Sequence, residues 1–323
     1  GSCQIAGPQP VLSEITSPFD FRFPGVARCA TPGRFRACGL RKQSLMKAHI
    51  ALLALAALVT ACTEPVAGDE EEGSSESSIV GGSTSTSLPS VGAVITFDSK
   101  GNYTTYCSSF LITSRIVMSA GHCGAHDGLP SFYTGGGVRL TNPPKTRADL
   151  KGFVEHKLKA KVVHAKYKGG TAESLKGTLS AVQGTMLNDF ALYELAEPLT
   201  NVTPLQIAGT TPKSGDTCTA IGYGYDSEGT TIGAMQKREA TVRVTTRSAQ
   251  WLEVVKVNGE PAKGDSGSPL VCNGTVRGVL SFWYATDPKR PADDKDFYSN
   301  ATGGDVRDFV NSTAKKWGVP GIN

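Results

Sequence analysis

From Ile79 to the C-terminus, the chain carries its apolar and β-branched residues in short runs separated by Gly, Asn, Asp and Pro. Strands of this length at such spacing favour an all-β barrel or sandwich. Only 305–317 has helical periodicity, with Val306, Phe309 and Val310 on one face. We expect strands at 91–96, 108–112, 116–118, 161–164, 190–195, 218–222, 240–244, 251–257, 269–272 and 276–282.

Within this part, residues 263–272 read Lys-Gly-Asp-Ser-Gly-Ser-Pro-Leu-Val-Cys, a composition that suits a nucleophile. Glycines let the backbone turn sharply, so Ser266 can project its hydroxyl into a cleft. The N–H groups of Gly264 and Ser266 can then converge on one point, as an oxyanion hole requires. Taken alone, the same string is equally compatible with a surface turn.

Three more motifs accompany this stretch: Ile-Val-Gly-Gly at 79–82, Ser-Ala-Gly-His-Cys at 119–123 and Asn-Asp-Phe-Ala-Leu at 188–192. Together, and in their order His, Asp, Ser, the motifs resemble those of chymotrypsin/trypsin-type serine proteases. The resemblance covers 79–323. It implies two six-stranded antiparallel β-barrels with the active site between them, a C-terminal helix, and hydrolysis of protein or peptide substrates.

The resemblance implies that Ser266 is the nucleophile, His122 the general base and Asp189 the group that orients the imidazole. Serine needs an adjacent base, and an imidazole with a pKa near ~6.5 exchanges protons around neutral pH. The resemblance also implies that Gly264 and Ser266 form the oxyanion hole and that Ser281 hydrogen-bonds Asp189. Without it, a lone histidine is more often structural, and an Asp before an apolar strand can cap a turn.

The resemblance also implies that the protease is made as an inactive precursor and is activated by cleavage. In this family, cleavage frees an amino terminus that inserts into the protein and pairs with the Asp preceding the nucleophile; here the pair would be Ile79 and Asp265. A buried charge needs such a partner. Ser78 stands before the cleavage site in place of Lys or Arg. An enzyme that cuts after basic residues would therefore need another, activating protease.

Substrate preference depends on three residues of the expected specificity pocket. Glu260 lies six residues before Ser266, where trypsin-like members hold an Asp, and Asp296 is the second candidate carboxylate. Two carboxylates would favour Lys or Arg side chains. Trp283 stands where a glycine usually leaves the pocket entrance open. Alternatively, both acidic residues are ordinary solvated loop charges.

Four of the eight cysteines lie in this part. An even set in an exported domain favours disulfides, and four cysteines allow three pairings. The resemblance implies Cys107–Cys123 and Cys218–Cys272. No Cys-x-x-Cys or paired Cys/His spacing supports a metal site, and we expect neither a metal nor another cofactor.

The residues before Ile79 have a different composition. Residues 1–45 are interpreted as a non-native or disordered upstream segment. Residues 46–61 begin Met-Lys and continue as an apolar run, the layout of a bacterial secretory signal peptide. The following Cys62 completes a sequence similar to a lipobox, in which the cysteine is lipidated; ordinary signal cleavage is the alternative. Residues 62–78 are acidic and predict a disordered linker or pro-segment.

We therefore expect an exported protein, held at a bacterial outer membrane or cell surface by a lipid anchor at Cys62, or otherwise secreted. The formal net charge is +4, with 26 Lys/Arg and 21 Asp/Glu scattered from Ile79 onward. Scattered charge of this size does not predict a nucleic-acid partner.

Two other functions remain open. One is a binding or scaffold protein on a protease fold that has lost activity, because fold does not guarantee function; an intact set of His122, Asp189 and Ser266 argues against it. The other is an esterase or lipase, but those enzymes normally use a Gly-x-Ser-x-Gly elbow on an α/β sheet.

Overall fold

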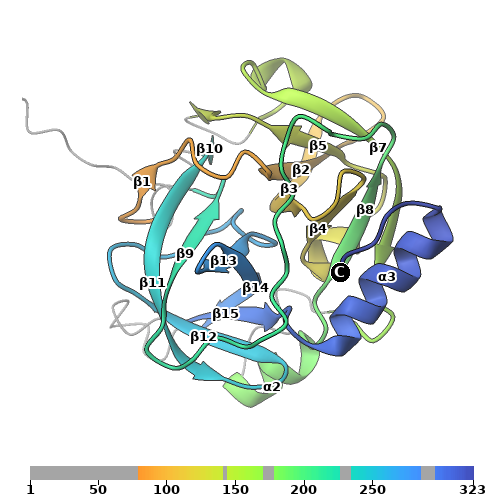
Figure 1. Cartoon of the computed structure of the whole chain (residues 1–323). Helices are drawn as coiled ribbons and strands as arrows, with labels where there is room; N and C mark the ends of the chain where they lie inside the picture. Colours follow the sequence, from red (N-terminus) through yellow and green to blue (C-terminus); the bar gives the residue numbers. More distant parts are fainter. Residues whose placement is uncertain (1–78, 141–143, 170–177, 226–233, 285–294) are drawn as a thin grey trace, which may run out of the picture. The chain divides into compact units, whose positions relative to one another are not determined.

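The computed structural model describes residues 79–140, 144–169, 178–225, 234–284 and 295–323 (Figure 1). The interpretations of 1–45, 46–61, Cys62 and 62–78 concern residues outside these ranges.

Six antiparallel strands close into a first barrel in the order β2-β3-β4-β8-β7-β5. Their side chains pack on both faces in places: Ile116, Val117 and Met118 of β4 are all fully buried. Such strands appear in the sequence as continuous apolar runs rather than alternating ones. The strands are β2 (Val91–Phe97), β3 (Tyr103–Leu111), β4 (Ile116–Ser119), β5 (Ser131–Thr134), β7 (Val154–Val163) and β8 (Ala191–Leu195).

A second antiparallel barrel has the order β9-β11-β12-β15-β14-β13, and β9 closes it by pairing with both β11 and β13. β1 (Ser83–Thr84) adds to β11, while β6 (Gly137–Leu140) and β10 (Ala234–Gln236) form a separate two-stranded sheet. The barrel strands are β9 (Thr217–Gly222), β11 (Arg238–Arg247), β12 (Trp251–Lys256), β13 (Pro269–Cys272), β14 (Thr275–Tyr284) and β15 (Lys295–Asn300).

The C-terminal helix α3 (Gly304–Trp317) buries Val306, Val310 and Ala314 in a core that it shares with the first barrel. It ends at Gly318, whose φ of 67° suits a glycine cap. The two-barrel, all-β prediction with a C-terminal helix is confirmed.

The expectation of a single helix was wrong. Two shorter helices, α1 (Gly121–Gly124) and α2 (Leu179–Thr185), and a 3₁₀ turn at Arg147–Asp149 are also present. They are too short to show helical periodicity in the sequence. Each of the ten expected strands overlaps a strand of the structure, whereas β1, β5, β6, β10 and β15 were not anticipated.

Candidate active site

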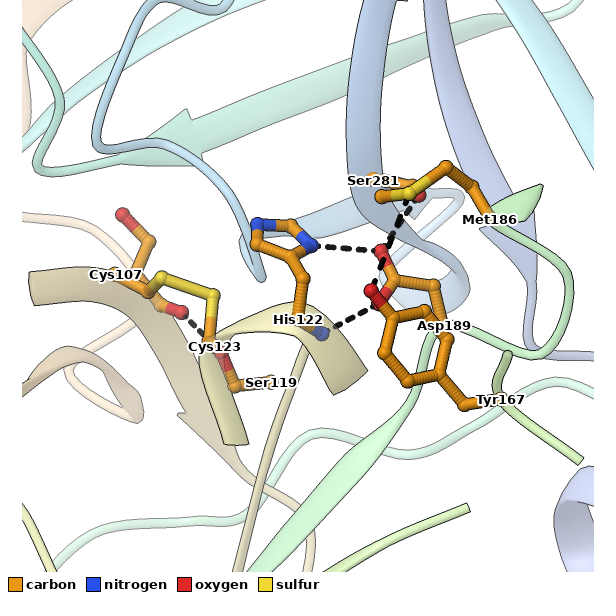
Figure 2. Close-up of polar contacts among 9 residues, drawn as sticks. Cys107, Ser119, His122, Cys123, Tyr167, Met186, Asp189 and Ser281 are labelled. Atoms are coloured by element: carbon orange, nitrogen blue, oxygen red, sulfur yellow. Dashed lines mark hydrogen bonds and ion pairs between the residues drawn. A yellow bond between two sulfur atoms is a disulfide. The ribbon is translucent and has the colours of Figure 1, made fainter. Parts of the chain in front are cut away.

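His122 lies on α1, the single turn that follows β4, and one carboxylate holds it in two ways. Its Nδ1 lies 2.8 Å from Asp189 Oδ2, and its backbone N–H donates to Asp189 Oδ1 at 2.7 Å (Figure 2). The two contacts fix both the position of the residue and the rotation of its ring. A ring whose Nδ1–H faces a carboxylate leaves Nε2 as the proton acceptor.

Asp189 is fully buried just before β8 and also contacts the second barrel. Ser281 of β14 donates its hydroxyl to Asp189 Oδ2 at 2.6 Å. On the other side, a Cβ at Gly121 would lie 3.0 Å from Asp189 Oδ1, so glycine allows this close approach. Side chains from both barrels thus meet on one carboxylate.

Two opposing effects act on the His122 imidazole, whose side chain is 22% exposed. Burial lowers its pKa, while the negative charge of Asp189 and the hydrogen bond to it raise the pKa. The raising effects win, and the pKa of His122 lies above its usual value. The site therefore stabilises an imidazolium, the form that a general base reaches after it takes a proton.

Ser266 lies in the turn before β13, and its neighbour Gly267 contacts the segment just ahead of His122. Gly267 has a φ of 83°, and a Cβ there would lie 2.0 Å from Ser119 Oγ and 2.9 Å from Ala120 N. Only glycine fits this contact, which brings the Ser266 turn against the His122 turn. Within the described ranges no hydrogen bond joins Ser266 Oγ to His122; this contact is often long in unliganded enzymes.

Two backbone donors beside the Ser266 hydroxyl have no partner in the part of the chain that the structure describes: the N–H groups of Gly264 and Ser266. Gly264 has a φ of 94°, and a Cβ on it would lie 2.4 Å from the hydroxyl of Tyr106. The backbone here therefore needs glycine, and it leaves two N–H groups available to a ligand.

Among models of protein families, the one described as trypsin matches residues 79–302. The chain belongs to the trypsin family. Its relatives include Trypsin delta of Drosophila erecta, 24% identical over 221 residues that cover 63% of this chain and 78% of the relative. Trypsin CFT-1 of Choristoneura fumiferana is 27% identical over 250 residues, which cover 70% and 88% of the two chains.

A solved structure with the same fold is a mutant of human heparin binding protein (CAP37), with a TM-score of 0.54 and 21% identity. The alignment covers 76% of this chain and 100% of that chain. At this identity the likeness establishes the shared fold alone.

Both disulfides that the trypsin-family resemblance implied are present in the structure, Cys107–Cys123 and Cys218–Cys272. The first ties β3 to the turn that carries His122. Its sulfur atoms lie within 4.8 Å of a His122 ring nitrogen. Because they are bonded to each other, they are not available as metal ligands.

Asp265 and Ile79 are both buried, but in the described structure no ion pair or hydrogen bond joins them. The Asp265 carboxylate instead accepts N–H groups from Gly224 at 2.8 Å and Ala262 at 2.9 Å. Burial raises the pKa of Asp265 to about 7, despite these two hydrogen bonds. Ile79 packs into the core of the second barrel.

The residues expected at the specificity pocket differ in exposure. Glu260 and Asp296 are 8% and 6% exposed, so the alternative that they are solvated loop charges is wrong. Glu260 forms an ion pair with Lys256 at 3.2 Å. Trp283 is 60% exposed and pairs with Asp296 across β14 and β15.

Three neighbours of the site carry no sequence motif and were missed. The Tyr167 hydroxyl donates to the sulfur of Met186, three residues before Asp189, at 4.0 Å (Figure 2). Ser108, fully buried on β3, donates its hydroxyl to the carbonyl of Gly264 at 3.0 Å. Nothing local in the sequence marks these residues, because each contact joins segments that are distant along the chain.

Replacing Asp189 by Asn removes the charge that raises the pKa of His122 and leaves the burial that lowers it. We expect the pKa of His122 to fall in Asp189→Asn, because burial, which lowers it, then acts without the opposing charge. An NMR titration of the histidine ring protons measures this. His164, buried against Phe309, serves as the control and should not move. Equal His122 pKa values in the two chains would contradict this account.

Proposed function

We propose that the chain is an exported serine endopeptidase that hydrolyses peptide bonds of protein or peptide substrates. The observation that carries the proposal is the pairing of His122 with a fully buried Asp189, beside a turn that presents Ser266. Membership of the trypsin family supports the same reaction class.

In the proposed reaction, Ser266 Oγ attacks the scissile carbonyl while His122 Nε2 takes its proton. Asp189 stabilises the resulting imidazolium, and the N–H groups of Gly264 and Ser266 stabilise the oxyanion. His122 then protonates the departing amine, which leaves an acyl-enzyme. Water, activated by the same imidazole, releases the acyl group as a carboxylic acid and restores the serine.

Activation is proposed to require cleavage between Ser78 and Ile79 by another protease. In the intact chain the nitrogen of Ile79 is an amide, and Asp265 is a buried carboxyl with a raised pKa. Cleavage would create an ammonium group that can pair with this carboxylate. A buried carboxylate is much more stable with such a partner than without one.

A preference for Lys or Arg is proposed on the burial of Glu260 and Asp296. Buried carboxylates attract a cationic side chain more strongly than exposed ones, because the surrounding medium screens less. The ion pair with Lys256 offsets part of the charge of Glu260.

Export is supported by the two disulfides, which form and persist in oxidising compartments. A lipid anchor at Cys62, which lies outside the described residues, stays a proposal. Across the described ranges, every helix is too short or too polar to cross a membrane.

A fluorophosphonate probe tests whether Ser266 is an activated nucleophile. For the chain cut before Ile79 we expect one covalent adduct, mapped to Ser266 by mass spectrometry. Ser266→Ala should not react. His122→Ala should react more slowly by a factor of roughly 10³ or more, because the base is lost. A correctly processed chain that stays unlabelled would instead support a catalytically inactive binding or scaffold protein.

The raised pKa of Asp265 predicts how the stability of the uncleaved chain depends on pH. The folded chain binds a proton more tightly than the unfolded one, so stability is full at low pH and is lost as pH rises toward about 7. Between pH 5 and pH 8 we expect a loss of about 2–3 kcal/mol from this group. Denaturant unfolding measures the loss.

Asp265→Asn in the same uncleaved chain is the control, and it should remove this share of the pH dependence. The chain cut before Ile79 should also lose less stability between the two pH values, because an ammonium partner lowers the pKa of the carboxyl. The same pH dependence in all three forms would rule out the proposed pairing.

A peptide-library cleavage profile tests the substrate preference, with Lys and Arg expected before the scissile bond. Asp296→Asn should lower kcat/KM for a Lys substrate roughly tenfold relative to a norleucine substrate. Glu260→Gln should also lower it, and Lys256→Met should strengthen the preference because it removes a cation that pairs with Glu260. A profile without Lys or Arg enrichment would contradict the proposal that Glu260 and Asp296 select basic side chains.

A further inference from the structure

The direction of the Gly264 N–H is set by a contact on the other side of its peptide group. The carbonyl of Lys263 accepts a hydrogen bond from Tyr225 N at 2.9 Å. In a planar trans peptide the C=O and the N–H point in opposite directions. The Gly264 N–H, which belongs to the same peptide, must therefore point away from Tyr225.

The Ser266 N–H is directed in the same manner. It shares a peptide group with the carbonyl of Asp265, which accepts a hydrogen bond from Ser268 N at 2.9 Å. Holding that carbonyl turns the Ser266 N–H to the opposite side of the peptide plane. The two donors of the proposed oxyanion hole are thus oriented through the carbonyls that precede them.

The peptide between these two donates its N–H, that of Asp265, to the carbonyl of Ala262 at 3.0 Å, and its carbonyl is held by Ser108. The carbonyl of Gly264 accepts from the backbone N–H of Ser108 at 3.1 Å and from its hydroxyl at 3.0 Å. The same hydroxyl oxygen accepts from Tyr223 N at 3.0 Å. It therefore links the segment that begins at Tyr223 to the carbonyl of Gly264.

The Ser108 hydroxyl thereby joins the two segments that form the Tyr225–Lys263 hydrogen bond. Tyr225, which holds the Lys263 carbonyl, lies two residues after Tyr223. On its other side, the carbonyl of Ser108 accepts the hydroxyl of Ser119 at 2.8 Å, and Ser119 lies in the strand that leads to His122. Ser108 thus contacts both the strand that leads to the base and the turn that carries the oxyanion donors.

We propose that Ser108 is a positioning residue for the oxyanion hole: its hydroxyl sets the position of the 223–225 segment relative to Gly264 and so aligns the Gly264 N–H. The inference rests on the proposed protease function. Ser108 does not touch the substrate in this proposal; it acts through the Gly264 peptide. Its loss should affect the transition state, where negative charge develops on the oxyanion, more than substrate binding.

Ser108→Ala removes the hydroxyl and keeps the backbone N–H contact to Gly264. Ser109→Ala is the matched control, since Ser109 is the next residue of the same strand, is equally buried, and its hydroxyl has no partner in the described structure. Both variants are compared with the parent chain after cleavage before Ile79. Active-site titration counts the functional molecules, and thermal melting monitors folding.

For Ser108→Ala we expect kcat to fall roughly tenfold, with KM within about twofold of the parent value. Inhibition by a peptide aldehyde, which forms a tetrahedral adduct with the serine, should weaken by the same factor as kcat/KM. Ser109→Ala should leave kcat and aldehyde inhibition unchanged.

Unchanged kcat and aldehyde affinity in Ser108→Ala, in an active parent chain, would overturn this inference and leave the protease proposal intact. Equal losses in Ser108→Ala and Ser109→Ala would also overturn it, because they would indicate general packing. A processed parent chain that neither cleaves peptides nor reacts with a fluorophosphonate would overturn both proposals.

Discussion

The buried carboxylate of Asp189 is the interaction on which the site depends. It accepts a backbone N–H and a ring N–H from His122 in the first barrel and a hydroxyl from Ser281 in the second. A carboxylate without water around it needs such donors to remain charged. Each donor that satisfies it also fixes a structural element: the turn after β4, the imidazole ring, and β14.

Close backbone packing provides the second constraint. The Ser266 turn approaches the first barrel where Gly267 lies against Ser119, and there is no room for a Cβ at that point. Gly264 similarly lies against Tyr106. The two glycines therefore do more than permit positive φ angles, because they let two barrels meet at the distance that the site requires.

Apolar runs are local signals, and they predicted the all-β fold class and ten strands. The His122–Asp189 pairing followed from the family resemblance that the short motifs carry. The sequence pattern missed β15, whose Lys-Asp-Phe-Tyr-Ser-Asn sequence buries the polar residues Asp296, Ser299 and Asn300. Burial of polar groups depends on neighbouring strands and has no local pattern. Ser108 was missed for the same reason: its partner Gly264 is 156 residues away.

Two buried carboxylates in this structure are satisfied differently. Asp189 accepts hydrogen bonds from an imidazole, a hydroxyl and one backbone N–H, whereas Asp265 accepts only two backbone N–H groups in the described structure. Burial raises the pKa of Asp265 to about 7. Gly224, whose N–H donates to Asp265, lies between Tyr223 and Tyr225. The N–H of Tyr223 donates to the Ser108 hydroxyl, and that of Tyr225 donates to the Lys263 carbonyl. A change in the charge of Asp265 would therefore act on the same short segment that orients the Gly264 N–H. Activation and oxyanion binding would then share one structural element.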